Sequence, residues 1–272
     1  MRVIEIRASH ALTPSGLPEY QYALNPYLGC YHGCRYCYAR DFTGGDAGRR
    51  WGEVVYVKVN IPALLRSEVK VLRPGIVGIS TITDPYQPVE AKYRITRSSL
   101  EILLPAGFHA SIQTKSTFIL KDADLLFVYR DRVDVGFTIT TMDRDKARLL
   151  EPKAPPPEAR AYALTRISEL GVRTWIFLGP LIKGLNDSAE DYRPVLELAK
   201  RTHSEVFVDR YRPRPGADAM LSALGISASA DRSWWRSKTQ EIKSECSALG
   251  VICRTAEEEW RMYDKGRRRL EL

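Results

Sequence analysis

The chain has 272 residues, of which 44% are hydrophobic and 27% are charged, as in an ordinary globular protein with a sizeable core. These values exclude a disulfide-stapled mini-protein and global disorder. Lysine and arginine total 41 against 33 for aspartate and glutamate, and the net charge of +8 favours a polyanionic partner without identifying one. Residues 1–8 lack the apolar run of a signal peptide, and no segment reaches the roughly 20 apolar residues of a membrane-spanning helix. We therefore expect a cytoplasmic protein that makes no membrane contact.

Short β-branched runs alternate with amphipathic segments along the chain. The expected strands cover residues 75–79, 109–114, 133–140, 172–178, 205–209 and 250–253. The expected helices cover residues 62–72, 96–104, 120–129, 157–170, 188–201 and 230–249. This alternation predicts a parallel sheet with right-handed crossovers. About six βα units fit into the chain, fewer than the eight of a closed barrel. The sequence thus predicts an α/β fold, a partial (β/α)6 barrel of the TIM type with an open parallel sheet and outer helices.

Two segments are expected to be loops. Residues 151–157 contain four prolines, too many for a helix interior, and the flanking Glu151 and Arg160 are expected to form a structural ion pair. Residues 210–230 are rich in Pro, Gly, Ala and Ser and should form a long loop before the last helix. We divide the chain into an N-terminal extension (1–21), a barrel core (22–211) and a C-terminal part (212–272). The helix, strand and basic tail of that last part should complete the barrel.

The strongest chemical signal is the segment NPYLGCYHGCRYCY at residues 25–38, which holds Cys30, Cys34 and Cys37. Gly29 and Gly33 let its backbone curl around a metal centre. In a cubane iron–sulfur cluster the protein ligands are thiolates, so three cysteines would leave the fourth iron open. An open iron can bind and activate another molecule, and the spacing therefore favours a [4Fe–4S] cluster.

A structural zinc site is the alternative, with His32 as the fourth ligand of a Cys3His set. His32 lies only two positions after Cys30, which is a poor reach for a tetrahedral site. Cys246 and Cys253 are seven positions apart and do not supply a second zinc-ribbon pair. We expect these two to be small buried side chains in a reducing compartment rather than parts of a disulfide framework.

The cysteine motif, with Tyr36 before its last cysteine, resembles the signature of the radical S-adenosylmethionine (radical SAM) superfamily. More narrowly, the chain resembles the branch related to spore photoproduct lyase, often described as DNA repair photolyase-like. The resemblance runs from residue 22 to residue 211. It rests on four further segments: TDPYQPVE at 83–90, QTKS at 113–116, EPKAP at 151–155 with Arg160 after it, and GPLIKGLND at 179–187.

This resemblance implies an enzyme with two cofactors, the [4Fe–4S] cluster and S-adenosylmethionine. The open iron would bind the amino and carboxylate groups of S-adenosylmethionine, and one electron from the reduced cluster would cleave a carbon–sulfur bond. The resulting 5′-deoxyadenosyl radical would abstract a hydrogen atom from a substrate. The implied partner is a one-electron reductant such as a flavodoxin or ferredoxin, while the protein supplies orientation and excludes water.

Contacts to S-adenosylmethionine are expected at the carboxyl ends of the strands, where parallel α/β folds gather their ligands. Thr83 or Asp84 should contact the methionine amino group. Lys115, a point charge at a strand end, suits the methionine carboxylate, although a solvated lysine is also common there. Tyr36 should lie near the adenine or shield the cluster.

Other candidates are less specific. Thr138 and Thr140 would bind the carboxylate or the ribose, but β-propensity alone also explains them. Spore photoproduct lyase carries a cysteine in the loop after its second strand, whereas residues 80–84 read STITD here, which puts photoproduct cleavage in doubt. Cys253 and Tyr86 are the remaining candidate radical partners.

The substrate is indicated by basic and aromatic residues after the strand at 205–209. Arg210, Tyr211 and Arg212 combine guanidinium groups with a ring, a composition able to hold phosphate and stack a base. The C-terminal tail adds further positive charge at residues 261, 265 and 267–269. One hypothesis is therefore radical chemistry on DNA or RNA, for repair or base modification. A small molecule or a protein side chain is the alternative substrate, and a zinc-bearing nucleic-acid-binding module is a third hypothesis.

Overall fold

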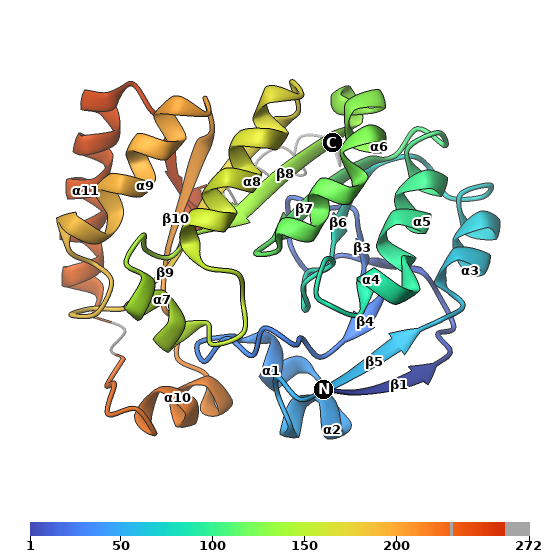
Figure 1. The fold of residues 1–272 in the computed structure, drawn as a ribbon, viewed down its shortest axis with the longest axis horizontal. Helices are drawn as coiled ribbons and strands as arrows, with labels where there is room; N and C mark the ends of the chain where they lie inside the picture. Colours follow the sequence, from blue (N-terminus) through green and yellow to red (C-terminus); the bar gives the residue numbers. More distant parts are fainter. Residues whose placement is uncertain (229–230, 259–272) are drawn as a thin grey trace, which may run out of the picture.

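A computed structural model describes residues 1–228 and 231–258 of the chain (Figure 1). Its centre is an eight-stranded sheet in the order β11-β10-β9-β8-β7-β6-β3-β2. All neighbours in this sheet are parallel except β2 and β3. The sheet does not close on itself, because β11 and β2 form its two edges. The predicted open, mostly parallel α/β sheet is therefore confirmed.

The strands of the central sheet have these bounds: β2 Leu12–Pro14, β3 Tyr22–Leu24, β6 Ile76–Ile79, β7 His109–Thr114, β8 Val133–Thr138, β9 Arg173–Leu181, β10 Glu205–Arg210 and β11 Cys253–Thr255. Every residue of β8 is buried, as expected of a parallel strand covered on both faces. The predicted strands correspond to β6–β11. The last strand begins at Cys253 rather than at residue 250, and it joins the sheet by pairing with β10.

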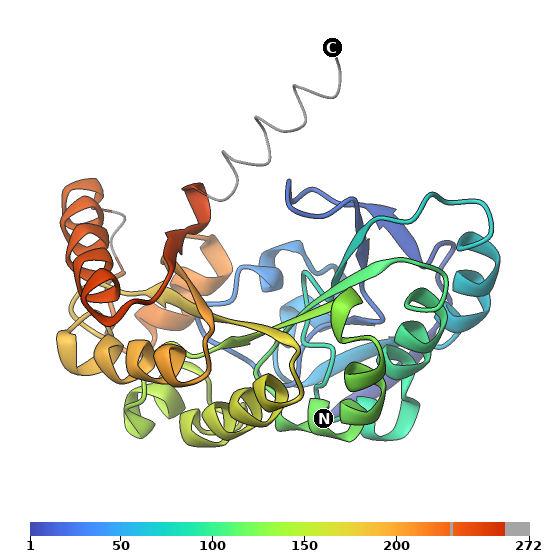
Figure 2. The same cartoon turned by 90° about the horizontal axis from the view of Figure 1, so that it is seen from above.

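The helices of the outer layer are α3 Ile61–Glu68, α5 Ile95–Leu103, α6 Ala123–Val128, α8 Pro157–Glu169, α9 Ala189–Arg201 and α11 Arg232–Leu249. Figure 2 shows them along the outer side of the curved sheet. They correspond to the predicted helices, with residues 117–122 before α6 forming a 3-10 turn, η1 Thr117–Asp122. The predicted start of the last helix at Ala230 lies outside the described residues. Among the described residues, no helix is both long and apolar enough to cross a membrane.

A second, smaller sheet supports the cysteine segment. It has the order β1-β5-β4, with β1 Arg2–Ile6 parallel to β5 Val54–Lys58 and β4 Tyr27–Leu28 antiparallel to it. None of these strands was predicted. Residues 1–21 thus contribute strands to both sheets, while the proposed division of the chain at residues 22 and 212 stays a prediction.

Five further short helices lie in the connections: α1 Ala39–Phe42, α2 Gly45–Arg49, α4 Glu90–Tyr93, α7 Arg144–Leu150 and α10 Pro215–Ser222. A short 3-10 turn, η2 Arg130–Arg132, precedes β8. Helix α10 corrects the prediction of an unbroken loop over 210–230. Pro215 occupies the first turn of α10, where a proline costs no hydrogen bond. Two side chains of the same helix, Ala217 and Leu221, are buried. Residues 229 and 230 of the predicted loop lie outside the described residues.

Candidate cluster site

The three cysteines lie on a loop between β4 and α1, at the carboxyl ends of β6, β7 and β8. All three thiols are free, with Cys30 and Cys34 buried and Cys37 partly exposed. The loop turns twice, because Gly33 N donates to Cys30 O and Cys37 N donates to Cys34 O. We call residues 29–37 the cysteine loop.

Gly29 is required where the cysteine loop passes β5. Its φ of +81° is a conformation that other residues rarely adopt, and an added Cβ would lie 2.5 Å from Val54 O. The carbonyl of Gly29 accepts hydrogen bonds from Thr83 Oγ1 at 2.7 Å and Gln87 Nε2 at 3.1 Å. Gln87 Oε1 in turn accepts from Tyr31 N at 2.8 Å. The loop after β6 therefore clamps the first half of the cysteine loop.

Asp84 ties the cysteine loop to the end of β7. Its carboxylate accepts from Thr114 Oγ1 at 2.7 Å and from the backbone N–H groups of Lys115 and Tyr86. The same group lies 3.2 Å from His32 Nε2. Burial opposes ionisation of Asp84, but the facing His32 and these donors outweigh it and lower its pKa to about 2. Thr83 and Asp84 were expected to contact the methionine amino group. In this structure, Thr83 Oγ1 donates to Gly29 O of the cysteine loop, and the Asp84 carboxylate accepts from Thr114 and Lys115 at the end of β7.

The donor set fits a cluster better than a single zinc ion. Among the described residues, no three His, Cys, Asp or Glu side chains are placed to hold one metal ion. His32 cannot complete a Cys3His set as it stands, because Nε2 faces Asp84 and Nδ1 faces Lys153 O at 3.5 Å. Three thiolates that do not converge on one ion suit a cubane, in which each binds a different iron.

The buried environment of the three thiols disfavours their deprotonation. Burial raises the pKa of Cys34 to about 12, with Lys115 acting in the opposite direction. Burial also raises the pKa of Cys30 and of Cys37. Burial alone would lower the pKa of Lys115, but nearby Cys34 and Glu151 raise it above its usual value. Deprotonating the thiols thus requires positive charge beside them, which both Lys115 and iron supply.

A buried polar network supports the other side of the loop. The Tyr36 hydroxyl donates to Glu151 Oε1, and Glu151 Oε2 lies 2.5 Å from Arg160 Nη1 in a fully buried ion pair. Arg160 also donates to the carbonyls of Pro155 and Thr138. The predicted pair between Glu151 and Arg160 is therefore present. Lys115 Nζ lies 5.7 Å from the centre of the Tyr36 ring, so two of the predicted cofactor residues meet beside Cys34.

The two candidate threonines differ in their surroundings. Thr138 ends β8, and its hydroxyl accepts from Gln113 Nε2 at 3.0 Å. Thr140 follows it, fully buried, and its hydroxyl has no hydrogen-bond partner in the described part of the chain. A buried hydroxyl without a protein partner is costly, so a water molecule or a polar group of a ligand is expected beside it.

Of the two predicted radical partners, Cys253 is not available as a free thiol, whereas the role of Tyr86 stays a prediction. Cys253 is bonded to Cys246 in a disulfide between the end of α11 and the start of β11. This corrects the expectation of two free thiols, because Cys253 carries no S–H in this form. Tyr86 is fully buried, and its hydroxyl donates to Asp122 Oδ2 at 3.0 Å.

The predicted substrate residues are engaged by acidic neighbours. Arg212 Nη2 lies 3.0 Å from Asp209, and Arg210 Nη2 lies 3.5 Å from Glu257. Tyr211 is buried and donates to Asp218 Oδ1 at 2.7 Å. The basic tail at residues 261–269 lies outside the described residues.

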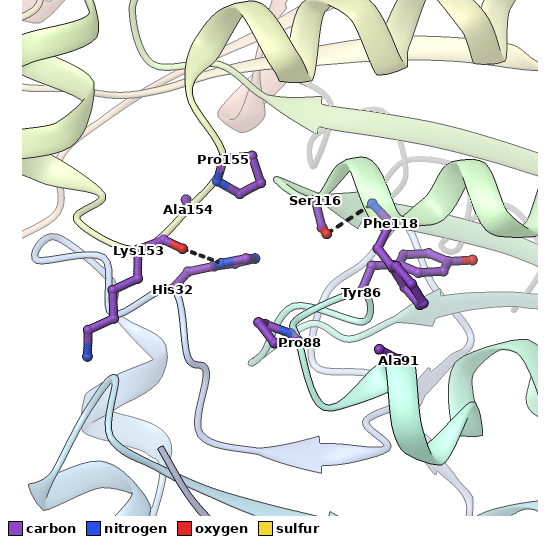
Figure 3. Close-up of a pocket in the computed structure, with 9 residues that line it drawn as sticks. All are labelled: His32, Tyr86, Pro88, Ala91, Ser116, Phe118, Lys153, Ala154 and Pro155. Atoms are coloured by element: carbon purple, nitrogen blue, oxygen red, sulfur yellow. Dashed lines mark hydrogen bonds between the residues drawn. The ribbon is translucent and has the colours of Figure 1, made fainter.

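A cavity of about 370 Å³ adjoins the cysteine loop at His32. Figure 3 shows it between this loop, the loops after β6 and β7, and the proline-rich segment that follows α7. The residues that line it are His32, Tyr86, Pro88, Ala91, Ser116, Phe118, Lys153, Ala154 and Pro155. The ring of His32 faces this space, whereas the Lys153 side chain points away from it.

Two supports of the site carry no recognisable sequence signal. Trp51 Nε1 donates to Cys34 O at 3.3 Å, and Lys153 Nζ donates to Gly52 O at 2.7 Å. Both contacts join segments far apart in the chain, and no spacing rule connects such segments. Only the folded structure identifies them.

The chain matches the model of the radical SAM superfamily over residues 24–199. An uncharacterized protein of Methanocaldococcus jannaschii is 33% identical over 69% of this chain and 70% of its own length. A radical SAM Nα-GlyT isomerase of Pseudomonas phage M6 is 26% identical over 59% of this chain and 33% of its own length. The chain spans between about half and 70% of the length of the first curated relatives it matches.

Among solved structures, the fold is similar to that of a spore photoproduct lyase variant with bound AdoMet and a dinucleoside spore photoproduct. The TM-score is 0.66 at 14% identity, over 92% of this chain and 81% of the other. At this identity the likeness shows the fold alone. The superfamily match covers most of the chain, including all three cysteines. This chain therefore belongs to the radical SAM superfamily, whose members use a [4Fe–4S] cluster and S-adenosylmethionine.

Proposed function

We propose that this enzyme binds its cluster through Cys30, Cys34 and Cys37, cleaves S-adenosylmethionine reductively and abstracts hydrogen from a base or sugar of a nucleic acid. The observation that carries the proposal is the cysteine loop, with three free thiols held at the carboxyl ends of the strands and both ring nitrogens of His32 directed at other groups. When bound, the cluster supplies the electron that breaks the carbon–sulfur bond of S-adenosylmethionine.

The protein's own part is to orient the cofactor and exclude water. Lys115, held beside Cys34 and over the Tyr36 ring, offers a positive charge to the methionine carboxylate. Thr140 offers a buried hydroxyl that would hydrogen-bond a polar group of the cofactor. Thr83 and Asp84 act as positioning residues, because their contacts fix the cysteine loop relative to β7.

A nucleic acid is the proposed substrate class because one structural neighbour holds a dinucleoside photoproduct. Photoproduct cleavage itself is not proposed, since residues 80–84 contain no cysteine and Cys253 is in a disulfide.

A small molecule or a protein side chain is the second candidate substrate. The pairing of Arg210 with Glu257 and of Arg212 with Asp209 favours it, because these acids offset the charge that would attract phosphate.

The cofactor chemistry is tested by anaerobic reconstitution with iron and sulfide, followed by dithionite and S-adenosylmethionine. We expect 5′-deoxyadenosine from the wild type, detected by mass spectrometry. Cys34→Ala should lose most of its iron and form none while remaining folded by circular dichroism. An unchanged iron content in this variant would refute the ligand assignment.

The substrate class is tested separately by binding of DNA and tRNA across a salt series. Contacts to several phosphates predict an affinity that falls by orders of magnitude between about 50 and 200 mM salt. Deuterium transferred from a labelled oligonucleotide into 5′-deoxyadenosine would establish hydrogen abstraction. Absence of binding even at low salt would exclude a nucleic-acid substrate and favour a small molecule or a protein side chain.

A further inference from the structure

The inner face of the curved sheet, opposite the helices in Figure 2, carries its own set of side chains. Successive residues of a strand point to opposite faces, and one alternating set of β7 to β10 is aliphatic or aromatic and packs in the core under the helices. The other set therefore lines the inner face: His109, Ser111, Gln113, Asp134, Gly136, Thr138, Trp175, Phe177 and Phe207. In the described part of the chain, none of its three aromatic rings joins the core clusters.

The half of this face nearer the amino ends of the strands is filled by its own contacts. Asp134 accepts hydrogen bonds from Ser111 Oγ and Trp175 Nε1, both at 2.7 Å, and its other oxygen lies 2.8 Å from His109 Nε2. The indole of Trp175 covers Gly136, where an added Cβ would lie 2.3 Å from the ring. The Trp175 ring is thus fixed in place and buried.

Phe177 lies in the other half and is oriented towards the carboxyl end of β9. A Cβ added to Gly179 would lie 2.8 Å from Cε1 of Phe177, so the ring rests over this glycine. Phe177 is partly exposed, whereas the three residues before it and the two after it are buried. A large ring that is partly exposed on the inner face is available to stack with a planar group.

Gln113 is a second partly exposed side chain at this level. Its Nε2 donates to Thr138 Oγ1 at 3.0 Å, and Thr138 is in register with Phe177. Within the described residues, no hydrogen bond reaches Gln113 Oε1, and the amide nitrogen carries a second N–H. Since β8 separates β7 from β9, the strands of Gln113 and Phe177 are about 10 Å apart. A heterocycle can span this distance with its face on the ring and its edge at the amide.

These two side chains lie next to the residues assigned above to the cofactor. Lys115 comes two positions after Gln113, and Thr140 comes two positions after Thr138. Residues two positions apart along a strand are about 7 Å apart. A group held between Gln113 and Phe177 would therefore lie beside S-adenosylmethionine, as a direct transfer of hydrogen between substrate and cofactor requires.

We propose that Phe177 and Gln113 select the reacting nucleotide, Phe177 by stacking on the base and Gln113 by hydrogen bonding to its edge. The inference rests on the proposed function, because it takes the substrate to be a nucleic acid. The edge of Gln113 suits a base that carries a donor and an acceptor side by side, as adenine and thymine do. A base within a duplex would have to leave its stack to reach this face.

The test variants are Phe177→Leu and Gln113→Met, which remove the ring and the amide but keep apolar bulk. The chain offers a matched control for each on the outer helices. Phe127 on α6 is 51% exposed, and Gln240 on α11 is also exposed. The controls are therefore Phe127→Leu and Gln240→Met. All proteins are reconstituted with iron and sulfide and compared in iron content and circular dichroism.

Binding is measured by fluorescence anisotropy with short single strands of DNA that differ only in their bases: all thymine, all adenine or abasic. We expect the wild type to bind a base-bearing strand about tenfold more tightly than the abasic strand. Phe177→Leu should lose most of this advantage, while its affinity for the abasic strand stays within about twofold of wild type. The wild type should also distinguish thymine from adenine by about fivefold or more, and Gln113→Met should bring the two affinities within about twofold of each other.

Affinity for S-adenosylmethionine, measured by equilibrium dialysis, should be the same in both test variants and the wild type. The control variants should match the wild type in every measurement. A base advantage that persists in Phe177→Leu would overturn the role of Phe177, and an unchanged ratio of thymine to adenine affinity in Gln113→Met would overturn that of Gln113. A matching loss of affinity for S-adenosylmethionine would overturn the proposal by assigning both side chains to the cofactor.

The fate of the proposed function is read separately. If the wild type binds no strand even at low salt, this inference and the nucleic-acid substrate fail together, while formation of 5′-deoxyadenosine still decides the cofactor chemistry. If binding depends on the bases as expected but no 5′-deoxyadenosine forms with dithionite, the radical reaction fails and the base site stands.

Discussion

At the scale of single residues, Asp84 is the main link between the cysteine loop and the sheet. Four donors or cationic partners converge on one buried carboxylate, and its pKa of about 2 lies below the unfolded value of 3.8. At about 1.4 kcal/mol for each pKa unit, this shift is equivalent to about 2 kcal/mol of stability. Because the folded pKa is the lower one, this contribution is complete above pH 4 and is lost as the pH falls towards 2.

We predict that Asp84→Asn lowers the free energy of unfolding by about 2 kcal/mol at pH 7 and reduces iron incorporation. The difference between variant and wild type should shrink as the pH falls from 4 to 2, because the wild-type carboxylate is then protonated. Urea unfolding of the metal-free proteins at several pH values measures this. A difference independent of pH would show that the charge of Asp84 is not what stabilises the fold.

The ion pair of Glu151 and Arg160 leads to a second prediction. Arg160→Met leaves the Glu151 carboxylate buried without its cation, and breaking a buried pair in this way costs about 3 to 5 kcal/mol. The exposed pair of Arg166 and Glu169 is the control, because Arg166→Met there should cost less than about 1 kcal/mol. Chemical denaturation of both variants makes the comparison. Equal losses of stability in the two variants would show that burial does not determine how much the ion pair contributes.

At the scale of elements, the cysteine loop depends on its close approach to β5. Gly29→Ala would place a Cβ 2.5 Å from Val54 O in a backbone conformation unfavourable for alanine. The loop must then move away from β5, and we expect most of the iron to be lost on reconstitution. Gly44→Ala is the matched control, since its φ is −73° and its added Cβ has open space. Iron analysis of both proteins distinguishes them, and a Gly29→Ala protein with full iron content would contradict this account.

The sequence predicted the long buried strands and their helices well, but not the elements that frame the site. Strands β6 to β10 are four to nine residues long and contain buried apolar or β-branched residues, so their pattern is visible locally. Strands β2, β3 and β4 are two or three residues long, and β3 and β4 pair with strands that lie about 30 to 50 residues later in the chain. The segment of α10 was predicted to be a loop because its glycine and alanines give only a weak apolar periodicity.

The cysteine motif was recognisable because a short spacing encodes it, and the family assignment that rests on it is confirmed, whereas the ligand role of each cysteine stays a prediction. The roles of Thr83 and Asp84 were harder to predict. Their hydroxyl and carboxylate are equally suited to a ligand and to backbone groups, and only the fold shows Gly29 O and Lys115 N within reach. Cys253 illustrates the same difficulty, since its pairing with Cys246 depends on where α11 ends.

At the scale of the whole molecule, the small sheet connects the N-terminal residues to the metal site. Strand β1 pairs with β5 over five residues, and Asn60 exchanges hydrogen bonds with the backbone of Ala8. Strand β5 in turn supports Gly29. The N-terminal segment is thus joined to the cysteine loop through β5.

We predict that deletion of residues 1–8 lowers the urea midpoint and reduces iron incorporation, because β5 becomes an exposed edge. Replacing Arg2 by alanine is the control, since this side chain is exposed and the backbone ladder is kept. Unfolding curves and iron analysis are the measurements. Normal stability and iron content after the deletion would mean that β1 is dispensable.

The clamp on Gly29 also bears on how the enzyme matures. The hydrogen bonds from Thr83 and Gln87 to Gly29 O involve no cysteine side chain, so they do not themselves depend on a metal ligand. In zinc fingers the energy of metal binding is used to fold the chain. Here that energy remains available for holding the cluster. We therefore expect a cell short of iron to accumulate a folded precursor that can be loaded with metal after its synthesis.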